Sequence, residues 1–193
     1  ILPSTLADVR LRARLTNGSV AEGESNIPSA GVTVDRIEIL PSDVPAYAEA
    51  TAALTHAELI VFGPGSLFTS VLPNLLVSGI REALLDSPAH KVYVANVATQ
   101  YGETNGFSAA DHFAAIRRHL SRDDVADVVL ANSNLPGEPL PAIWRSEPVS
   151  APGDADYGAA RLELADLVDH ERRYRHDSER LAAAVMRSYF ERD

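Results

Sequence analysis

The chain has 193 residues, of which 46% are apolar, and a formal net charge of −10. This length suits one domain with a sizeable core, and no run of about 18 apolar residues predicts a membrane-spanning helix. The absence of cysteine excludes disulfides and thiolate metal sites and is compatible with a reducing cytoplasm, while the negative charge disfavours general binding to nucleic acid or an anionic membrane.

The region near the start of the chain predicts a β-hairpin. Residues 9–16 alternate apolar and polar side chains, as a half-buried strand does, and Asn17-Gly18 is a strong turn signal. The partner strand runs from Ser19 to about Glu24, so residues 9–24 are expected to form a hairpin appendage whose arginines face solvent. The chain begins with Ile1 rather than Met and lacks a signal-like segment, and we expect it to be part of a longer protein.

The middle of the chain alternates predicted strands and helices. The strands are expected at residues 32–40, 59–62, 91–98 and 125–131, and the helices at 45–57, 67–76, 78–87 and 107–120. Pro73 is expected to break or kink a longer helix, and Ser108 and Asp111 have the spacing of a capping box. The alternation predicts an α/β fold, with a Rossmann-like parallel sheet, helices on both of its faces and the hairpin as an appendage.

The last third of the chain is less regular. Residues 132–158 are rich in Pro, Gly and Ser and predict a long surface excursion anchored by Trp144. Residues 161–168 are expected to form an edge strand. Asp177 or Ser178 is expected to cap a final helix that ends near Phe190 and packs on the sheet through an apolar stripe.

The turn after the strand at residues 59–62 is the first candidate binding site. Gly63, Pro64 and Gly65 can expose several N–H groups at once, because glycine adopts backbone angles closed to other residues. Three hydroxyls would lie at the start of the next helix: Ser66, Thr69 and Ser70. The pattern favours a cradle for phosphate. An ordinary strand-to-helix turn with Ser66 as N-cap accounts for it equally well, and no Lys follows to make a Walker loop.

Two further loops are expected at the same edge of the sheet. Ligands of doubly wound sheets bind at the carboxyl ends of the strands, which here selects residues 63–70, 96–107 and 132–135. The second loop carries donors and acceptors that suit sugar hydroxyls or a base edge: Asn96, Thr99, Gln100 and Glu103. Loop solubility would also account for these polar residues, but two polar loops at one edge favour a binding site.

Metal and nucleophile sites are less well supported. His112 and His119 lie almost two helical turns apart, which is not an ordinary ligand pattern, so no metal site is predicted. The residue inventory allows a Ser-His-Asp triad, but the Gly-x-Ser-x-Gly elbow is absent around Ser66.

Several stretches resemble the YvcK-type gluconeogenesis factors of the CofD-like superfamily. They are residues 58–76 (ELIVFGPGSLFTSVLPNLL), 91–96 (KVYVAN) and 99–112 (TQYGETNGFSAADH), with shorter matches at 23–27 (GESNI) and 175–177 (RHD). The resemblance covers nearly the whole chain and implies one CofD-like α/β domain over residues 1–193. It also implies a cytoplasmic regulator of cell shape, cell-wall synthesis and carbon metabolism that binds nucleotide sugars such as UDP-N-acetylglucosamine.

Two departures from the family pattern refine this expectation. Residues 63–67 read Gly-Pro-Gly-Ser-Leu rather than the Gly-Pro-Ser-Asn-Pro of the transferase branch, which favours the regulator branch. The glycine-rich nucleotide loop and the Asp-Asp-Gly-Gly stretch of the family are missing, so the chain is expected to lack the N-terminal nucleotide-loop portion.

Two alternatives stay open: a CofD-type phospholactyl transferase of coenzyme F420 biosynthesis, in which Asp or Glu would hold Mg²⁺, and a protein-interaction scaffold with a degenerate site. No other cofactor is implied. Relatives also suggest a homodimer. The apolar segment 71–80 is expected to contact another subunit or the missing N-terminal portion, or to be buried under the C-terminal helix.

Overall fold

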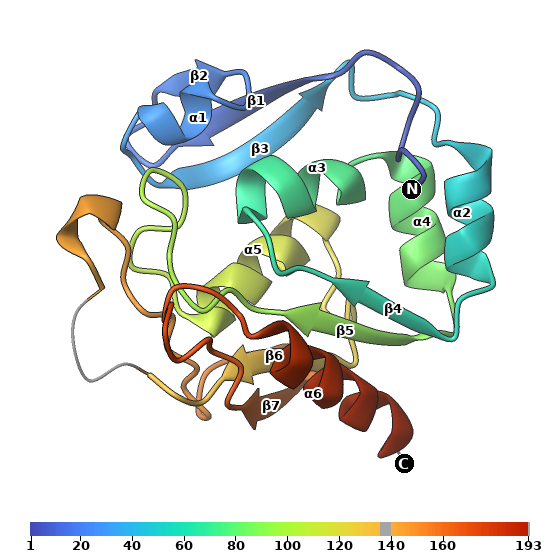
Figure 1. The fold of residues 1–193 in the computed structure, drawn as a ribbon. Coiled ribbons are helices and arrows are strands. Elements are labelled where there is room, and N and C mark those ends of the chain that lie inside the picture. Colours follow the sequence, from blue (N-terminus) through green and yellow to red (C-terminus); the bar gives the residue numbers. More distant parts are fainter. Residues whose placement is uncertain (136–139, 193) are drawn as a thin grey trace.

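The main element of the fold is a four-stranded parallel sheet (Figure 1). The structure is a computed structural model that describes residues 1–135 and 140–192. The strands follow one another across the sheet in chain order: β4 (Leu59–Phe62), β5 (His90–Val94), β6 (Val128–Asn132) and β7 (Arg161–Ala165). The predicted Rossmann-like α/β fold is confirmed, and residues 161–165 form the predicted edge strand.

Helices cover both faces of this sheet. On one face Tyr93 and Val129 pack into the core with Phe113 and Ile116 of α5 (Ala109–Leu120). On the other face α6 (Ser178–Phe190) packs against two valines of β5 and a valine and a leucine of β6, and Figure 1 shows these two helices on opposite sides of the sheet. Because successive side chains of a strand point to opposite faces, burial on both explains the continuous apolar runs of β5 and β6.

The two long helices, α5 and α6, begin at the capping residues that the sequence predicts. Ser108 and Asp111 form a capping box at the start of α5, and Asp177 caps α6 by accepting hydrogen bonds from the N–H groups of Glu179 and Arg180. Both helix starts agree with the prediction. α5 thus begins where the loop 96–107 ends, which fixes one end of that loop.

A second sheet contains three antiparallel strands, in the order β2-β1-β3. They are β1 (Arg10–Leu15), β2 (Val20–Glu22) and β3 (Val34–Leu40), with the short helix α1 (Asn26–Ser29) between the last two. The predicted hairpin is confirmed, with Arg12 opposite Glu22. β3 pairs on the other side of β1, with Ala13 opposite Ile37, so the hairpin is part of a sheet and not a separate appendage.

The segment after β4 departs from the prediction. A π-helical turn (Leu67–Val71) leads into α3 (Leu72–Leu75), and α4 (Ser78–Asp86) follows. Pro73 lies in the first turn of α3, where a missing N–H is tolerated, so it begins a helix and does not break one. The interruption falls instead at Leu76 and Val77.

The apolar side chains of this segment are used inside the chain. Leu72, Leu75 and Ile80 are buried. They lie between the two sheets, where α3 contacts β3 and α5, and not under α6. These three side chains are therefore not available for the expected contact with another subunit. α2 (Ala48–Thr55) lies beside α4 and completes this layer (Figure 1).

Candidate ligand-binding pocket

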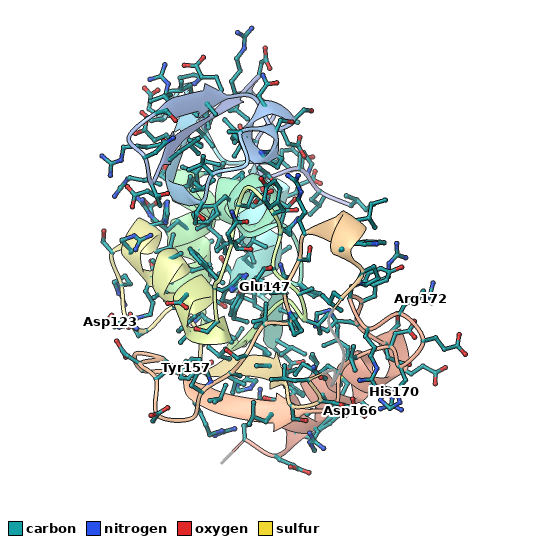
Figure 2. All side chains as sticks on the ribbon, turned by 90° about the vertical axis from the view of Figure 1, so that its left-hand side faces the viewer. Asp123, Glu147, Tyr157, Asp166, His170 and Arg172 are labelled. Atoms are coloured by element: carbon teal, nitrogen blue, oxygen red, sulfur yellow. The ribbon has the colours of Figure 1, made fainter. Side chains whose placement is uncertain are left out.

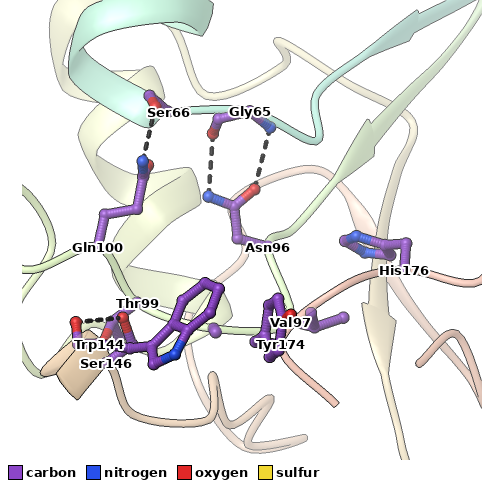
Figure 3. Close-up of a pocket in the computed structure, with 11 residues that line it drawn as sticks. Gly65, Ser66, Asn96, Val97, Thr99, Gln100, Trp144, Ser146, Tyr174 and His176 are labelled. Atoms are coloured by element: carbon purple, nitrogen blue, oxygen red, sulfur yellow. Dashed lines mark hydrogen bonds between the residues drawn. The ribbon is translucent and has the colours of Figure 1, made fainter. Parts of the chain in front are cut away.

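A cavity of about 320 Å³ lies at the carboxyl ends of β4 and β5 (Figure 3). Five of the predicted residues line it: Gly65, Ser66, Asn96, Thr99 and Gln100. They come from the loops after β4 and β5, whose ends meet because the two strands are parallel neighbours. The structure thus brings together the two polar loops that the sequence placed at this edge.

One amide side chain joins the two loops. The N–H of Gly65 donates to Asn96 Oδ1 at 3.0 Å, and Asn96 Nδ2 donates to the carbonyl oxygen of Gly65 at 2.9 Å. Gln100 Nε2 adds a second link by donating to Ser66 Oγ at 2.6 Å (Figure 3). A side-chain amide that satisfies both polar groups of one residue fixes the position of that backbone, so the pocket floor is held in place from within the chain.

The two glycines of the first loop differ in their roles. Gly63 has a φ of +77°, and a Cβ there would lie 2.5 Å from the carbonyl oxygen of Val94. Gly65 is outside the left-handed region, and a Cβ there would meet Val71 Cγ2 at 3.6 Å. The expectation of unusual backbone angles is met by Gly63 alone. Gly63 and the exposed Pro64 shape the turn and do not line the pocket.

A buried carboxylate occupies the start of the helical segment that was expected to bind phosphate. Glu103, which is 2% exposed, accepts hydrogen bonds from the N–H of Phe68 at 3.3 Å and from Thr69 Oγ1 at 3.0 Å. Burial raises the pKa of Glu103, and these hydrogen bonds lower it in part. Thr69, Glu103 and the exposed Ser70 therefore lie outside the pocket wall. Ser66 accepts from Gln100 and does not cap the helix, contrary to one of the two predictions for it.

Six residues of the pocket wall were not predicted as site residues: Val97 and Ala98 of the second loop, and four from outside both loops, Trp144, Ser146, Tyr174 and His176. These four come from the excursion after β6 and from the segment between β7 and α6. The rings of Trp144 and Tyr174 pack against each other in a tilted arrangement, with centroids 4.0 Å apart and planes inclined by 36°. Trp144 was expected to anchor the excursion. It remains half-exposed, and Val149 and Tyr157 are the buried anchors.

Hydrogen bonds donated by backbone N–H groups attach the excursion to the second loop. The N–H of Thr99 donates to the carbonyl of Glu147 at 2.8 Å, and the N–H of Glu147 donates to Thr99 Oγ1 at 2.9 Å. The N–H of Val149 donates to the carbonyl of Val97 at 3.0 Å. No local pattern in the sequence indicates this pairing, because the partners are about 50 residues apart.

The third predicted loop is ordered by a polar cluster beside the pocket. Asn132 is buried, and its Oδ1 accepts from the N–H of Leu167 at 3.0 Å. Asn134 Nδ2 donates to Asp166 Oδ1 at 3.2 Å, and Asp166 also contacts His170 and Arg180. Figure 2 shows Asp166 and His170 together at the end of β7. None of these side chains lines the cavity.

The two histidines considered as metal ligands are packed inside the chain. His119 Nε2 accepts from the N–H of Ile37 at 3.0 Å, while Nδ1 lies 2.6 Å from the carbonyl of Ala115, so the ring links α5 to β3. His112 is buried against Phe107. Within residues 1–135 and 140–192, no group of three or more His, Cys, Asp or Glu is placed to hold a metal ion. Nor does any helix in these ranges have the length and apolar character needed to cross a membrane.

Comparisons with known proteins agree with the resemblance seen in the sequence. The family model for 2-phospho-L-lactate transferase CofD matches residues 1–166. The gluconeogenesis factor of Halalkalibacterium halodurans is 38% identical over 171 residues, which cover 89% of this chain and 49% of that protein. The gluconeogenesis factor of Listeria monocytogenes is 35% identical over 187 residues, which cover 96% of this chain and 58% of that protein.

The solved structures give the same result. The crystal structure of a protein from Bacillus halodurans superimposes with a TM-score of 0.83 and 35% sequence identity, covering 96% of this chain and 61% of that one. The chain spans about half the length of the curated relatives it matches. It belongs to the CofD family, and within it to the YvcK-type proteins named gluconeogenesis factors.

Proposed function

We propose that this protein is a cytoplasmic, non-enzymatic regulator that binds a nucleotide sugar of the UDP-N-acetylglucosamine type in the pocket beside Asn96. Cell shape, cell-wall synthesis and carbon metabolism are the processes it would regulate, and a homodimer is its proposed assembly. The role in carbon metabolism is supported by relatives that bear the name gluconeogenesis factor.

The observation that carries this proposal is the meeting of two polar loops around one cavity. The Asn96 amide holds Gly65 by two hydrogen bonds, and the resulting cavity of about 320 Å³ falls within the usual size of small-ligand pockets. Hydroxyl and amide groups from both loops face it, which suits the sugar hydroxyls or the base edge of a nucleotide sugar, while an aromatic pair supplies an apolar wall. Such a mixture is typical of sites for nucleotides and their sugars.

The transferase alternative has one observation in its favour, the family model that bears the name of the CofD enzyme. The described residues that line the pocket include no carboxylate, and Glu103 is turned away toward Phe68 and Thr69. These residues do not fit a Mg²⁺ site, which prefers carboxylate oxygens. The chemistry of the pocket wall therefore favours binding over group transfer.

Calorimetric titration with UDP-N-acetylglucosamine tests the proposal, on the full-length protein and on this chain. Asn96→Ala is expected to weaken binding by about tenfold or more, because it releases the Gly65 backbone that forms the pocket floor. Ser70→Ala is the control, since Ser70 lies in the helical turn that follows Gly65, is exposed and is outside the pocket. Its affinity should stay within about twofold of the unsubstituted protein.

Circular dichroism would verify that both variants are folded. An absence of binding heat with the full-length protein would refute the nucleotide-sugar proposal and leave the scaffold alternative. Equal losses in Asn96→Ala and Ser70→Ala would place the ligand elsewhere.

A further inference from the structure

The aromatic wall of the pocket is formed by residues outside the two polar loops, Trp144 and Tyr174. Trp144 ends the short helical turn Ala142–Trp144, and its indole lies against the ring of Tyr174, from the segment between β7 and α6. Despite this contact, Trp144 is 43% exposed. A large aromatic ring at the mouth of a cavity offers a flat surface on which another planar group can stack.

The polar groups of the same pocket are uncharged. Among the described residues that line it there is no Lys, Arg, Asp or Glu. Burial lowers the pKa of His176, and a hydrogen bond with the Ala95 carbonyl raises it only in part, so the imidazole is neutral at pH 7. Phosphate groups prefer cations or several free N–H groups, whereas this wall suits an uncharged part of a ligand.

Two buried atoms of the wall have no hydrogen-bond partner within the described part of the chain. They are Gln100 Oε1 and His176 Nε2. The Gln100 amide is held at its other end, because Nε2 donates to Ser66 Oγ. A buried carbonyl oxygen without a donor is unusual in a folded protein, and an N–H group of a ligand would supply that donor after a small rotation of the amide.

A nucleobase meets these requirements better than a sugar does. Its face is planar and can stack on Trp144, and its edge carries few N–H donors, which matches the few unpartnered atoms of the wall. A sugar brings many hydroxyls, each of which needs both a donor and an acceptor. We propose that the pocket receives the nucleobase of the ligand, stacked on Trp144, with an N–H of the base donating to Gln100 Oε1. This inference rests on the proposed nucleotide-sugar function and deepens it.

The chain provides its own reporter, since Trp144 is its one tryptophan. Uridine is expected to change the fluorescence of this chain on titration, and N-acetylglucosamine is not. Trp144→Ala should weaken uridine binding by about 10- to 100-fold in calorimetry, and Trp144→Phe should retain most of it because a ring remains. Phe190→Ala is the matched control, because Phe190 is an exposed aromatic residue at the end of α6 and outside the pocket, and it should bind like the unsubstituted chain.

A second measurement isolates the hydrogen bond. N3-methyluridine lacks the N3–H donor and should bind more weakly than uridine to the unsubstituted chain. In Gln100→Leu the two nucleosides should bind equally, because the acceptor is gone. A preference for uridine that persists in Gln100→Leu would overturn this hydrogen bond, and unchanged uridine affinity in Trp144→Ala would overturn the stacking.

The results also separate this inference from the proposed function. If UDP-N-acetylglucosamine binds but Trp144→Ala binds it equally well, the function stands and the base site is wrong. If uridine binds through Trp144 but UDP-N-acetylglucosamine produces no heat, the base site stands and the nucleotide-sugar function is wrong.

Discussion

Glu103 is the buried group whose replacement gives the sharpest test of how the binding loops are supported. Its carboxylate accepts from the N–H of Phe68 and from Thr69 Oγ1, and it is almost inaccessible to solvent. Glu103→Ala leaves the buried N–H of Phe68 without an acceptor, at a cost of about 1–3 kcal/mol, while water can reach the partly exposed Thr69. With the cavity that truncation leaves, we expect the free energy of unfolding to fall by about 2–4 kcal/mol.

Glu103→Gln separates shape from charge. The glutamine oxygen can accept from Phe68, and its amide can donate to Thr69 Oγ1, so we expect a change of no more than about 1 kcal/mol. Burial raises the pKa of Glu103, so the folded chain holds this proton at a pH where the unfolded chain has released it. The unsubstituted chain should therefore lose stability as pH rises above about 4.5, relative to Glu103→Gln.

Urea unfolding followed by circular dichroism, from pH 4 to pH 8, measures both effects. Thr69→Val is the matched control, because it removes one donor and leaves the contact with Phe68. If Glu103→Ala were as stable as the unsubstituted chain, the carboxylate would not support the loop. If Glu103→Gln cost as much as Glu103→Ala, the charge and not the hydrogen-bonding shape would matter.

Three further predictions concern the stability of the chain and its self-association. Gly63→Ala should lower the free energy of unfolding by at least about 2 kcal/mol, because Gly63 has a positive φ and lies close to the carbonyl of Val94, while Gly65→Ala should cost less than about 1 kcal/mol. Thermal unfolding midpoints compare the two variants, and equal midpoints would contradict the different roles of the two glycines. Burial lowers the pKa of His119, so the free energy of unfolding should fall as pH drops below 6.5, by up to about 1.4 kcal/mol per pH unit for this residue. In His119→Gln the urea midpoint should fall less steeply with decreasing pH, and the same dependence of the midpoint on pH as in the unsubstituted chain would refute this. Val61 is 42% exposed on β4, an edge strand made of apolar residues, so this chain should self-associate at high concentration. Light scattering should show less self-association for Val61→Lys, and a monodisperse unsubstituted chain would contradict the prediction.

Local chemistry in the sequence predicts much of the fold. The apolar run of β4 and the capping box of Ser108 and Asp111 each depend on residues close together in the chain, so their signals are visible without tertiary structure. The pairing of β3 with β1 is different. Its register, with Ala13 opposite Ile37, depends on contacts between residues 24 positions apart, and hydrophobic alternation alone does not select the partner.

The candidate site likewise has a part that the sequence predicts and a part that depends on contacts between distant residues. Asn96 and Gln100 are predictable from the rule that ligands bind at the carboxyl ends of parallel strands. To apply this rule it is enough to know the order of strands and helices along the chain. The direction of the Glu103 side chain could not be predicted, because polar residues of a loop can point to a ligand or to an unsatisfied N–H with equal chemical sense. Trp144 and Tyr174 meet only in the folded chain.

The two halves of the pocket are therefore built by different means, and this has a consequence for binding. The polar half is attached to the ends of β4 and β5, and Asn96 fixes it through both backbone groups of Gly65. The aromatic half lies on two irregular segments, of which the one that carries Trp144 is attached to the second loop by hydrogen bonds between Thr99 and Glu147. A ligand that spans both halves adds contacts between a sheet-anchored loop and two irregular segments. Both amides are hydrogen-bonded within the chain, but Glu147 lies on one of the irregular segments that the ligand would add contacts to. Binding should therefore slow hydrogen exchange at the amide of Glu147 more than at that of Gly65.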